Sequence, residues 1–522
     1  MNGAVGGMAG GTDGVAAPVA PPPEGVRRRV WLSGSVGRHP NATIVALCAA
    51  VAAALDALQL ARPGYLLGGT PDISVYLGTA VRLVHGILPY RDFVLVQPPG
   101  GTLLLSPAAL LSDLVGTRWA LAMVRLGAIL VAAANVLIVG RLVRHHGRLQ
   151  TLVACGVMAV LPAEVYALNA GLLEPLVDLF CLIGAAIVLD SGALSSSWRR
   201  WLIGGAAIGF GVAVKLPAVV PALVLGAACL PEVRRRLVPF GGGVVAGFAV
   251  PSVAFIAAAP GSFFRDVVGG QLGRVPDASR ASVATRLAGM TVGGGGDAAV
   301  GITLALLAVT VLGLAVRGRR RDASEWFAIA SALLVAGVQF VPSQYYPQYA
   351  ALLAPFLALS LATAVDRLAG LVRRRVLVLA AVAACLAAVL AGQVVATEAS
   401  SVSDPAAAVD AVVPPGGCTL SNGPRVLVPS DRFVSTVPGC TAMVDPFGTM
   451  LTFAGDDGAG VALFRAAISH ADYLVLTGGV AGWLSGPYTP LQAVVTGDFH
   501  LVHSGDLWIY VRDGSPVVVG GR

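Results

Sequence analysis

The segment WALAMVRLGAILVAAANVLIVG (residues 119–140) decides the fold class, and the basic stretch RLVRHHGR (141–148) follows it directly. An apolar run of about 20 residues is long enough to cross the hydrocarbon core of a bilayer as a helix. Clusters of Arg next to such a run are typical of the cytoplasmic side of a membrane protein. The segment therefore predicts one transmembrane helix together with its orientation.

The composition of the 522-residue chain agrees with this interpretation. Only 12% of the residues are charged, 56% are hydrophobic, and the mean hydropathy is +0.79. Soluble domains carry about 25% charged residues, so we exclude a soluble cytosolic enzyme. The net charge of +7 comes almost wholly from Arg, since Lys215 is the only lysine. Because the Arg residues are dispersed in short clusters, nucleic-acid binding is not expected.

Ten further apolar runs resemble the first, which predicts an α-helical polytopic membrane protein with about 11 transmembrane helices. With this count, the Arg clusters all fall on one side and place more than half of the 35 basic residues in short cytoplasmic loops. We therefore expect a protein of the cytoplasmic (plasma) membrane with its N-terminus inside and its C-terminus outside. The predicted spans are residues 43–60, 119–140, 151–168, 172–190, 201–213, 215–230, 238–258, 299–316, 326–342, 350–366 and 376–394.

The spans divide the chain into regions. Residues 1–40 are rich in Gly, Ala and Pro and predict a disordered cytoplasmic leader. Residues 41–395 form the predicted transmembrane domain, which includes a long outer loop at 61–118. Within that loop, residues 73–86 and 101–115 predict helices that lie on the outer leaflet. A hydrophobic hairpin that crosses the membrane twice is the alternative.

The last region, residues 396–522, has the composition of a soluble unit and predicts a small extracytoplasmic α/β domain. Short apolar runs bounded by Gly, Pro and Asp are typical of strands. The expected strands are Val426–Val428, Tyr473–Thr477 and Leu507–Val511, and residues 458–470 are expected to form a helix.

Outside the spans, one pair of cysteines and one pair of histidines have side chains that can form a disulfide or bind a metal. Cys418 and Cys440 are the two cysteines of the C-terminal region, where an oxidising compartment permits a disulfide. Sequence alone does not decide whether that disulfide forms, because it carries no Cβ geometry. His145 and His146 lie in an Arg-rich cytoplasmic turn, and we do not assign them to a metal site.

Polar residues at the membrane edge are costly to bury and are therefore candidates for function. On the predicted topology they concentrate at the outer side of the membrane. The candidates are Asp72, Tyr76, Arg91, Asp92, Gln97, Asn169, Glu174, Lys215, Gln344, Tyr345, Tyr346 and Tyr349.

Each candidate also has a structural explanation. Asp72 could cap the helix at 73–86, and Glu174 could be a helix N-terminal charge favoured by the dipole. Arg91 and Asp92 could form an ion pair in a surface turn. Lys215 could extend to the lipid headgroups. The tyrosines of residues 345–349 could form an interfacial aromatic belt. The concentration of these residues on one face favours a functional site.

Several motifs of the sequence lie in or next to the predicted spans. They are the outer loop that opens with Asp72 and Tyr76, G-x-x-P-Y-R-D-F (86–93), P-P-G (98–100), Asn169–Pro175, the glycine-rich run Gly204–Lys215, and SQYYPQY (343–349). Together they resemble the GT-C superfamily of integral-membrane glycosyltransferases, and the resemblance covers the layout of residues 41–395. It is nearest in pattern to bacterial protein-mannosyl and aminoarabinose transferase-like members and to polyprenol-dependent mannosyl- and arabinosyltransferases.

The resemblance implies transfer of a hexosyl or pentosyl group from a polyprenyl-phosphate carrier to an acceptor hydroxyl on the outer face of the membrane. The acceptor would be a cell-envelope glycan, lipid or protein. Asp72 is then expected to be the general base, and Lys215 and Arg91 to meet the leaving phosphate. Tyr345, Tyr346 and Tyr349 would stack on sugars. The remaining predicted substrate-binding residues are Tyr76, Gln97, Asn169 and Gln344.

One departure from the family pattern keeps alternatives open. Many members carry two adjacent acids in the first outer loop, whereas Asp72 stands between Pro71 and Ile73. Asp92 or Glu174 could supply the second acid, and the sequence leaves open whether a divalent metal takes part. The alternative functions are a secondary transporter or lipid flippase and a non-catalytic scaffold whose outer domain binds a partner.

Overall fold

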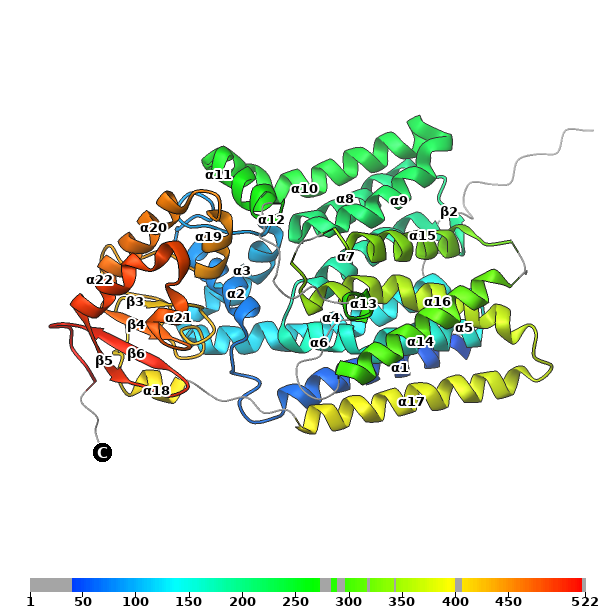
Figure 1. Cartoon of the computed structure of the whole chain (residues 1–522). Helices are drawn as coiled ribbons and strands as arrows, with labels where there is room; N and C mark the ends of the chain where they lie inside the picture. Colours follow the sequence, from blue (N-terminus) through cyan, green and yellow to red (C-terminus); the bar gives the residue numbers. More distant parts are fainter. Residues whose placement is uncertain are drawn as a thin grey trace, which may run out of the picture.

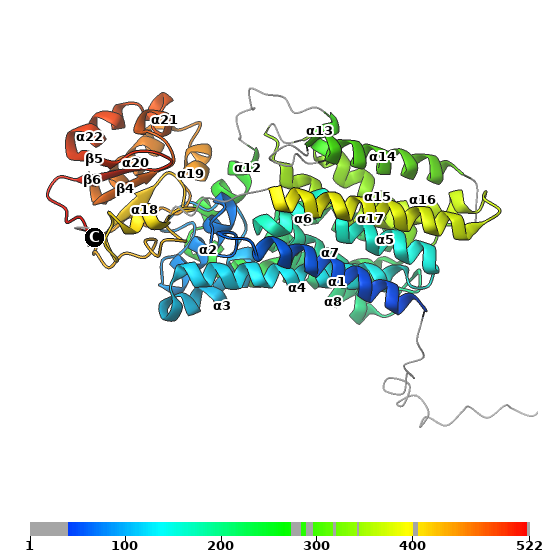
Figure 2. The same cartoon turned by 90° about the horizontal axis from the view of Figure 1, so that it is seen from below.

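The computed structural model describes residues 40–272, 283–288, 296–316, 320–341, 344–399 and 406–518. Except for Pro40, the predicted leader lies outside these ranges. A bundle of long helices carries a smaller α/β unit at one end (Figure 1). In Figures 1 and 2, α1 begins at the end of the bundle opposite to the α/β unit, as an odd number of membrane crossings requires.

Each predicted span coincides with a helix or a pair of consecutive helices, and α8 packs between α7 and α10. The long helices are α1 (Pro40–Leu60), α4 (Thr117–Val143), α5 (Arg148–Val160), α6 (Pro162–Ala170), α7 (Glu174–Val188), α8 (Trp198–Val214), α9 (Val219–Cys229), α10 (Val238–Ala258), α14 (Gly296–Ala315), α15 (Ala323–Val338), α16 (Ala354–Ala369) and α17 (Arg375–Ala399). The short elements between them are β1 (Leu189–Asp190), β2 (Ala193–Leu194), η2 (Leu216–Ala218), η3 (Leu230–Glu232), η4 (Val233–Leu237), α11 (Pro260–Phe264), η5 (Arg265–Gly269), α12 (Gly270–Leu272), α13 (Val283–Ala288) and η6 (Pro347–Leu353).

The helices differ in whether they could cross a bilayer unaided. By length and composition, five described helical segments could span a membrane, or six if the α5–α6 pair counts as one span. That pair bends by 44° where Pro162 starts α6. Helices α7, α8 and α15 have 15, 17 and 16 residues, which is shorter than a full span. The chain is a multi-pass membrane protein, and its eleven crossings stay a prediction.

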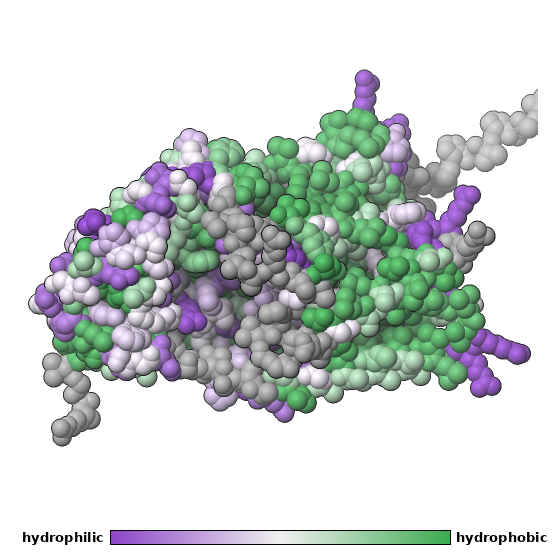
Figure 3. All heavy atoms as spheres, viewed as in Figure 1, coloured by the Kyte–Doolittle hydropathy of each residue, from purple (hydrophilic) through white to green (hydrophobic). Residues whose placement is uncertain are grey.

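The surface of the bundle is apolar. Figure 3 shows hydrophobic residues along the visible face of the bundle, with hydrophilic residues on the α/β unit and at the opposite end. Large apolar side chains are largely exposed on several helices, including Leu130 of α4, Val250 of α10 and Val311 of α14. An exposed apolar surface of this extent is stable in contact with lipid and not with water.

Glycines bring α8 and α10 into backbone contact. At Gly205, Gly209, Gly243 and Gly247, an added Cβ would lie 2.1–2.3 Å from a carbonyl oxygen of the other helix. Small residues four positions apart allow transmembrane helices to approach this closely. This packing fixes the position of α8, and Lys215 follows directly after its last residue.

The outer loop contains the two predicted helices, α2 (Pro71–Val84) and α3 (Gly100–Val115). Helix α2 contacts the α/β unit, because an added Cβ at Gly78 would meet the ring of Phe433 and Arg82 stacks on that ring at 4.8 Å. Buried residues of α2 also share an apolar cluster with residues of the C-terminal sheet. The outer loop therefore joins the α/β unit to the helical bundle.

The α/β unit has a four-stranded sheet in the order β3-β4-β6-β5, in which only the β3–β4 pair is parallel. Cys418, next to β3, forms a disulfide with Cys440. The strands are β3 (Thr419–Ser421), β4 (Tyr473–Leu476), β5 (Phe499–His503) and β6 (Trp508–Arg512). The helices are α18 (Ala406–Asp410), α19 (Pro446–Thr452), α20 (Asp457–His470), α21 (Val480–Trp483), η7 (Gly486–Tyr488) and α22 (Pro490–Asp498).

Two of the three predicted strands and the predicted helix are confirmed as β4, β6 and α20. The strand predicted at Val426–Val428 is wrong, because helical turns occupy this segment. The Val428 amide donates to the Pro424 carbonyl at 3.0 Å, and the Ser430 hydroxyl donates to the Val426 carbonyl at 2.8 Å. The short apolar run is buried, and burial alone does not distinguish a strand from a turn of helix.

Candidate active site

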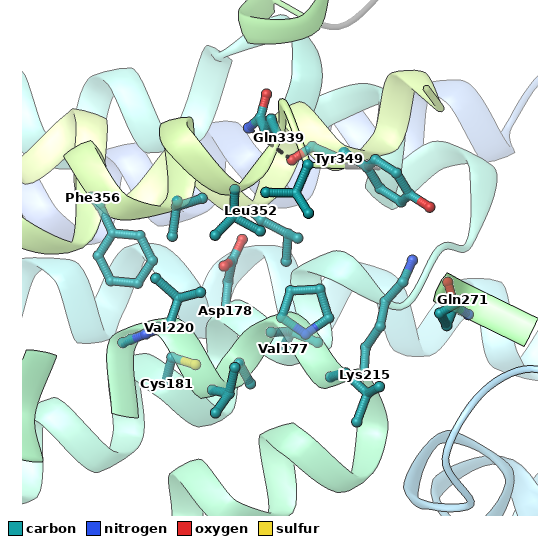
Figure 4. Close-up of a pocket in the computed structure, with 18 of the residues that line it drawn as sticks. Val177, Asp178, Cys181, Lys215, Val220, Gln271, Gln339, Tyr349, Leu352 and Phe356 are labelled. Atoms are coloured by element: carbon teal, nitrogen blue, oxygen red, sulfur yellow. Dashed lines mark hydrogen bonds between the residues drawn. The ribbon is translucent and has the colours of Figure 1, made fainter. Parts of the chain in front are cut away.

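A cavity of about 420 Å³ lies between α7, α9, α15 and η6 (Figure 4). Most of its lining is aliphatic or aromatic, and polar side chains enter it at a few positions. We call it the lysine cavity. Its polar lining residues are Gln97, Asp178, Lys215, Gln271, Gln339 and Tyr349.

Lys215 reaches this cavity because α8 ends immediately before it. Its backbone is extended (φ −158°, ψ 133°), and Pro217 then lies in the 3-10 helix η2. The side chain is 7% exposed and forms an ion pair with the fully buried Glu174, the first residue of α7. The ammonium lies 5.3 Å from the ring centre of Tyr349, toward which it points in Figure 4. This geometry permits a cation–π contact.

Asp72 is connected to the lysine cavity by a contact with helix η6. It lies in the first turn of α2, where Thr70 is the N-cap residue, so the capping explanation for Asp72 is wrong. Its Oδ2 accepts a hydrogen bond of 3.3 Å from Nε2 of Gln348. Gln348 precedes Tyr349 in η6, and that helix therefore links Asp72 to the lysine cavity.

Tyr76 lies one turn after Asp72 on α2, and its hydroxyl is close to the charged groups around Lys215. Burial raises the pKa of its hydroxyl well above the usual value, and the nearby charges of Asp72 and Glu174 act in the same direction. Tyr349 and Asp445 add to the shift. Two carboxylates, one from α2 and one from α7, thus lie close to a single buried phenol.

The other tyrosines of the late motif pack around Tyr349. The rings of Tyr345 and Tyr346 contact it edge-on, with centroids 6.5 and 5.6 Å away. The Tyr345 hydroxyl donates to the Thr285 carbonyl at 2.8 Å, and the Tyr346 hydroxyl donates to Gln344 Oε1 at 3.1 Å. Of this group, Tyr349 alone lines the cavity in the described part of the chain.

Asn169 lies where the bundle holds the outer loop. Its carbonyl accepts a hydrogen bond from Nη1 of Arg125 at 2.8 Å, while Nη2 of Arg125 donates to the Gly68 carbonyl at 2.7 Å. The Thr70 hydroxyl donates to the Ala170 carbonyl at 2.8 Å. These bonds hold the start of α2 against the end of α6.

Comparison with known proteins finds one matching family profile and several structures of similar fold. The profile of glycosyltransferase family 87 matches residues 96–343. No curated protein matches the sequence significantly. The crystal structure of ArnT from Cupriavidus metallidurans bound to undecaprenyl phosphate is similar over 91% of this chain and 99% of that one, with a TM-score of 0.60 and 16% identity. The chain has the fold of this ArnT structure, and nearly half of it matches the profile of glycosyltransferase family 87.

Two further structures show the same fold. Arabinofuranosyltransferase AftD from Mycobacteria is 17% identical with a TM-score of 0.54, and the match covers 90% of this chain and 40% of that one. The archaeal oligosaccharyltransferase AglB from Archaeoglobus fulgidus, in complex with an inhibitory peptide and a dolichol-phosphate, is 12% identical with a TM-score of 0.50. That match covers 84% of this chain and 69% of the other. The family match supports the glycosyltransferase hypothesis over the transporter and scaffold alternatives.

Arg91 and Asp92 lie at a different cavity. Together with Arg265, Phe453 and other residues, they line a space of about 380 Å³ between the outer loop, η5 and the α/β unit. We call it the arginine cavity. Arg91 donates twice to Asp92, at 2.9 and 2.8 Å, and this hydrogen bonding lowers the pKa of the carboxyl. The structure therefore gives this pair the geometry of the surface ion pair and does not bring it to Lys215.

Gln97 lies between the two cavities. Its side chain lines the lysine cavity, and its carbonyl accepts a 2.6 Å hydrogen bond from the hydroxyl of Tyr90, which lines the arginine cavity. The neighbouring Val96 carbonyl accepts a 2.8 Å bond from Nε2 of Gln271. The segment from Tyr90 to Gln97 thus connects the walls of both cavities.

Four polar residues of the site, Asp178, Gln271, Gln339 and Gln348, were not predicted as site residues. Asp178 lies inside the lysine cavity, one turn after Glu174 on α7, and that spacing is a signal that the sequence does carry. Gln348 belongs to the motif SQYYPQY (343–349), whereas Gln271 and Gln339 lie outside the quoted motifs. In the described residues, the one group of three metal-ligating side chains lies away from this cavity, at His145, His146 and Asp322.

Proposed function

We propose that this protein is a glycosyltransferase of the GT-C type that transfers a sugar from a polyprenyl-phosphate carrier to an acceptor hydroxyl at the outer face of the cytoplasmic membrane. The observation that carries the proposal is a buried lysine at the polar end of an apolar cavity. Lys215 is the only lysine of the chain, and its ammonium stands beside two carboxylates.

The lysine cavity suits a lipid phosphate for two physical reasons. An aliphatic lining favours an isoprenoid chain, because burial of apolar surface is stabilising. A lysine ammonium at the polar end is a point charge that suits a phosphate. The similar ArnT and AglB structures contain undecaprenyl phosphate and dolichol-phosphate. We assign the phosphate of the donor to the neighbourhood of Lys215.

In the proposed reaction, the oxygen of the acceptor hydroxyl attacks the anomeric carbon of the donor sugar. The new glycosidic bond forms as the bond from that carbon to the phosphate oxygen breaks, and the polyprenyl phosphate leaves with the electron pair. Asp72 accepts the proton of the hydroxyl as general base. Lys215 stabilises the charge that develops on the phosphate. One displacement of this kind inverts the configuration of the anomeric carbon.

The other residues of the cluster position these two groups. Gln348 holds Asp72 through its amide, and Glu174 fixes the ammonium of Lys215 within the cavity. Tyr349 offers a ring face beside Lys215, on which a sugar could stack. Gln97 adds to the polar wall, and Tyr76 lies beside Asp72 and Glu174, whereas Arg91 and Asp92 line the other cavity.

The disulfide supports an extracytoplasmic α/β unit. Structural disulfides persist in oxidising compartments and are rare in the cytosol. Because Cys418 and Cys440 are bonded, we place the α/β unit outside the membrane. The outer loop, which packs against this unit, then lies on the same side together with Asp72.

The proposal is tested by sugar transfer in membranes that contain the wild type or the Asp72→Asn variant. Radiolabelled sugars on polyprenyl phosphates, both hexosyl and pentosyl, serve as donors. Removal of a general base costs about 10²–10⁴-fold in rate. Asp92→Asn is the matched control, because it makes the same change in the same outer loop at the other cavity, and it should retain near wild-type transfer.

The outcomes separate the parts of the proposal. Loss of transfer in Asp72→Asn with retention in Asp92→Asn supports Asp72 as the base. The opposite result moves the base to Asp92 and would refute the assignment of the lysine cavity. If no donor supports transfer by the wild type, in membranes where a known transferase is active, the polyprenyl-phosphate donor is wrong.

A further inference from the structure

A cluster of three ligand side chains lies where the α4–α5 turn meets the start of α15. Nε2 of His145 and Nε2 of His146 lie 3.2 and 3.3 Å from Oδ2 of Asp322. The two nitrogens and the oxygen all lie within 4.8 Å of one another. The histidines are consecutive in sequence, yet both rings point to one carboxylate oxygen.

The backbone explains this convergence. After α4 the chain turns sharply, with a hydrogen bond of 2.9 Å from the His146 amide to the Val143 carbonyl, and Gly147 has a φ of +118°. Such a turn brings successive side chains to one side, and the two imidazole centroids are 3.7 Å apart with planes at 41°. The turn thus presents two imidazole nitrogens as a pair.

The second carboxylate oxygen of Asp322 accepts two other hydrogen bonds. Oδ1 accepts hydrogen bonds from the Glu325 amide at 3.0 Å and from the Ser324 hydroxyl at 2.7 Å. These bonds form the N-terminal cap of α15 and hold the carboxylate in a fixed orientation. Metal ligands in proteins are typically oriented by an outer hydrogen bond of this kind.

We propose that His145, His146 and Asp322 bind a divalent transition-metal ion, with Zn²⁺ the best match. Zinc takes imidazole nitrogen and carboxylate oxygen at about 2.0–2.2 Å in a tetrahedron, which places the ligand atoms roughly 3.3 Å apart. Two of the three separations already have this value. The fourth position would be filled by water.

The ion would join three segments that are distant in sequence. His145 and Asp322 are 177 residues apart. Gly192, in the turn between β1 and β2, lies against the same site, since an added Cβ would be 2.4 Å from Asp322 Oδ2 and 2.8 Å from His145 Nε2. The carbonyl of Gly192 also accepts a 2.9 Å bond from the Ala323 amide. We assign the metal a structural role at this end of the bundle, opposite to the α/β unit.

Two other His–Asp pairs of the described chain show what an ordinary pair looks like. His85 contacts Asp113 at 3.0 Å, and His500 contacts Asp513 at 2.8 Å. Each has a single histidine, and the side chains of the second pair are 55% and 69% exposed. At Asp322 the side chains are less exposed, with 7% for His146 and 21% for Asp322. The second histidine and the lower exposure distinguish the proposed site.

The test measures Zn²⁺ binding to the full chain, purified in detergent with a tag that contains no histidine and stripped of metal with a chelator. Competition with a chelating dye gives the affinity, and elemental analysis gives the stoichiometry. We expect one Zn²⁺ per chain. His146→Gln and Asp322→Asn should weaken binding by more than about 100-fold, and Ser324→Ala by about 10–100-fold, as for an outer-shell partner.

The His500→Gln variant is the matched control, because it removes a histidine from a His–Asp pair without a third ligand, and its affinity should equal that of the wild type. His146→Gln leaves the cap of α15 intact, so its elution in size-exclusion chromatography should not change. The proposal is overturned if the wild type binds no Zn²⁺ at micromolar concentration. It is also overturned if His146→Gln binds as tightly as the wild type.

Discussion

The lysine cavity and the arginine cavity each contain a cation paired with a carboxylate, but the two pairs differ in origin. Lys215 and Glu174 are 41 residues apart and buried, with 7% and 0% of their side chains exposed. Arg91 and Asp92 are adjacent in sequence and exposed to 50% and 28%. The first pair exists only because α7 and α8 pack together, whereas the second forms within a single turn.

This difference separates a candidate site from a surface feature. Burial of two charges carries a large desolvation penalty, which their mutual attraction offsets only with good geometry. An exposed pair contributes about 0–1 kcal/mol and needs no function to explain it. The buried pair borders a cavity suited to a lipid phosphate, and that setting favours function for Lys215 and Glu174.

The largest effect is expected from breaking the buried pair. Glu174→Gln leaves the Lys215 ammonium buried without its partner, and such a loss costs about 3–5 kcal/mol in the free energy of unfolding. The double variant Glu174→Gln/Lys215→Met removes both charges and should recover most of that loss. Denaturant unfolding of the detergent-solubilised protein measures both. Equal stability of the single variant and the wild type would show that the pair is not buried as described.

The next effect is on transfer activity. Lys215→Met removes the charge proposed to stabilise the leaving phosphate and should lower the rate by about 10²–10³-fold, as does the loss of one electrostatic stabiliser. Lys215→Arg keeps the charge and should retain more activity. Arg91→Met makes a comparable change at the arginine cavity. An equal loss in Lys215→Met and Arg91→Met would move the phosphate site away from the lysine cavity.

Hydropathy and Arg placement are sufficient to predict the helical bundle. Each apolar run of the sequence becomes a helix, because its backbone hydrogen bonds must be satisfied internally in lipid. The same reasoning fails for the α/β unit at Val426–Val428, where a three-residue apolar run has no periodicity to distinguish strand from helical turn. The sequence also contains a signal for the contact between α8 and α10, because Gly205 and Gly209 have the four-residue spacing of closely packed membrane helices.

The site is only partly readable from sequence. Asp72, Glu174, Lys215 and Tyr349 come from separate segments, and their polarity at a membrane edge is the signal that identifies them. Sequence gives no ground for separating Arg91 and Asp92 from this group, because the path of the outer loop depends on its packing against the α/β unit. The proposed metal site could not be predicted from the sequence either, because Asp322 is 177 residues away from His145 along the chain.

A buried carboxyl next to the arginine cavity adds a pH dependence. Arg265 lines that cavity and pairs with the fully buried Asp266 at 2.8 Å. Burial raises the pKa of Asp266 from 3.8 to about 6, against the lowering effect of Arg265. A raised pKa means that the folded state holds the proton more tightly. The contribution of Asp266 to stability is therefore most favourable below about pH 4 and is lost as the pH rises through 6.

Asp266→Asn removes this titration. Relative to the wild type, the variant should gain on the order of 2 kcal/mol in the free energy of unfolding between pH 4 and pH 7. Unfolding curves of both proteins at pH 4, 5, 6 and 7 measure the gain. Asp498→Asn, at an exposed ion pair with Arg512, is the control and should show no such change. A constant difference between Asp266→Asn and the wild type across this range would contradict the raised pKa.

The smallest effect is expected from the exposed pair itself. Arg91→Met, Asp92→Asn and the double variant should each change the free energy of unfolding by less than about 1 kcal/mol, because an exposed ion pair contributes little and is screened by salt. The Leu88 amide donates to Asp92 at 2.7 Å, so Asp92→Asn retains a side-chain oxygen that can accept this bond. Unfolding at 0.05 and 0.5 M NaCl checks the assignment. A coupling energy between the two positions as large as that of Lys215 and Glu174 would remove the distinction between the cavities. A coupling below about 0.5 kcal/mol that falls with salt would place Arg91 and Asp92 among ordinary surface pairs and leave the lysine cavity as the site to be tested for transfer.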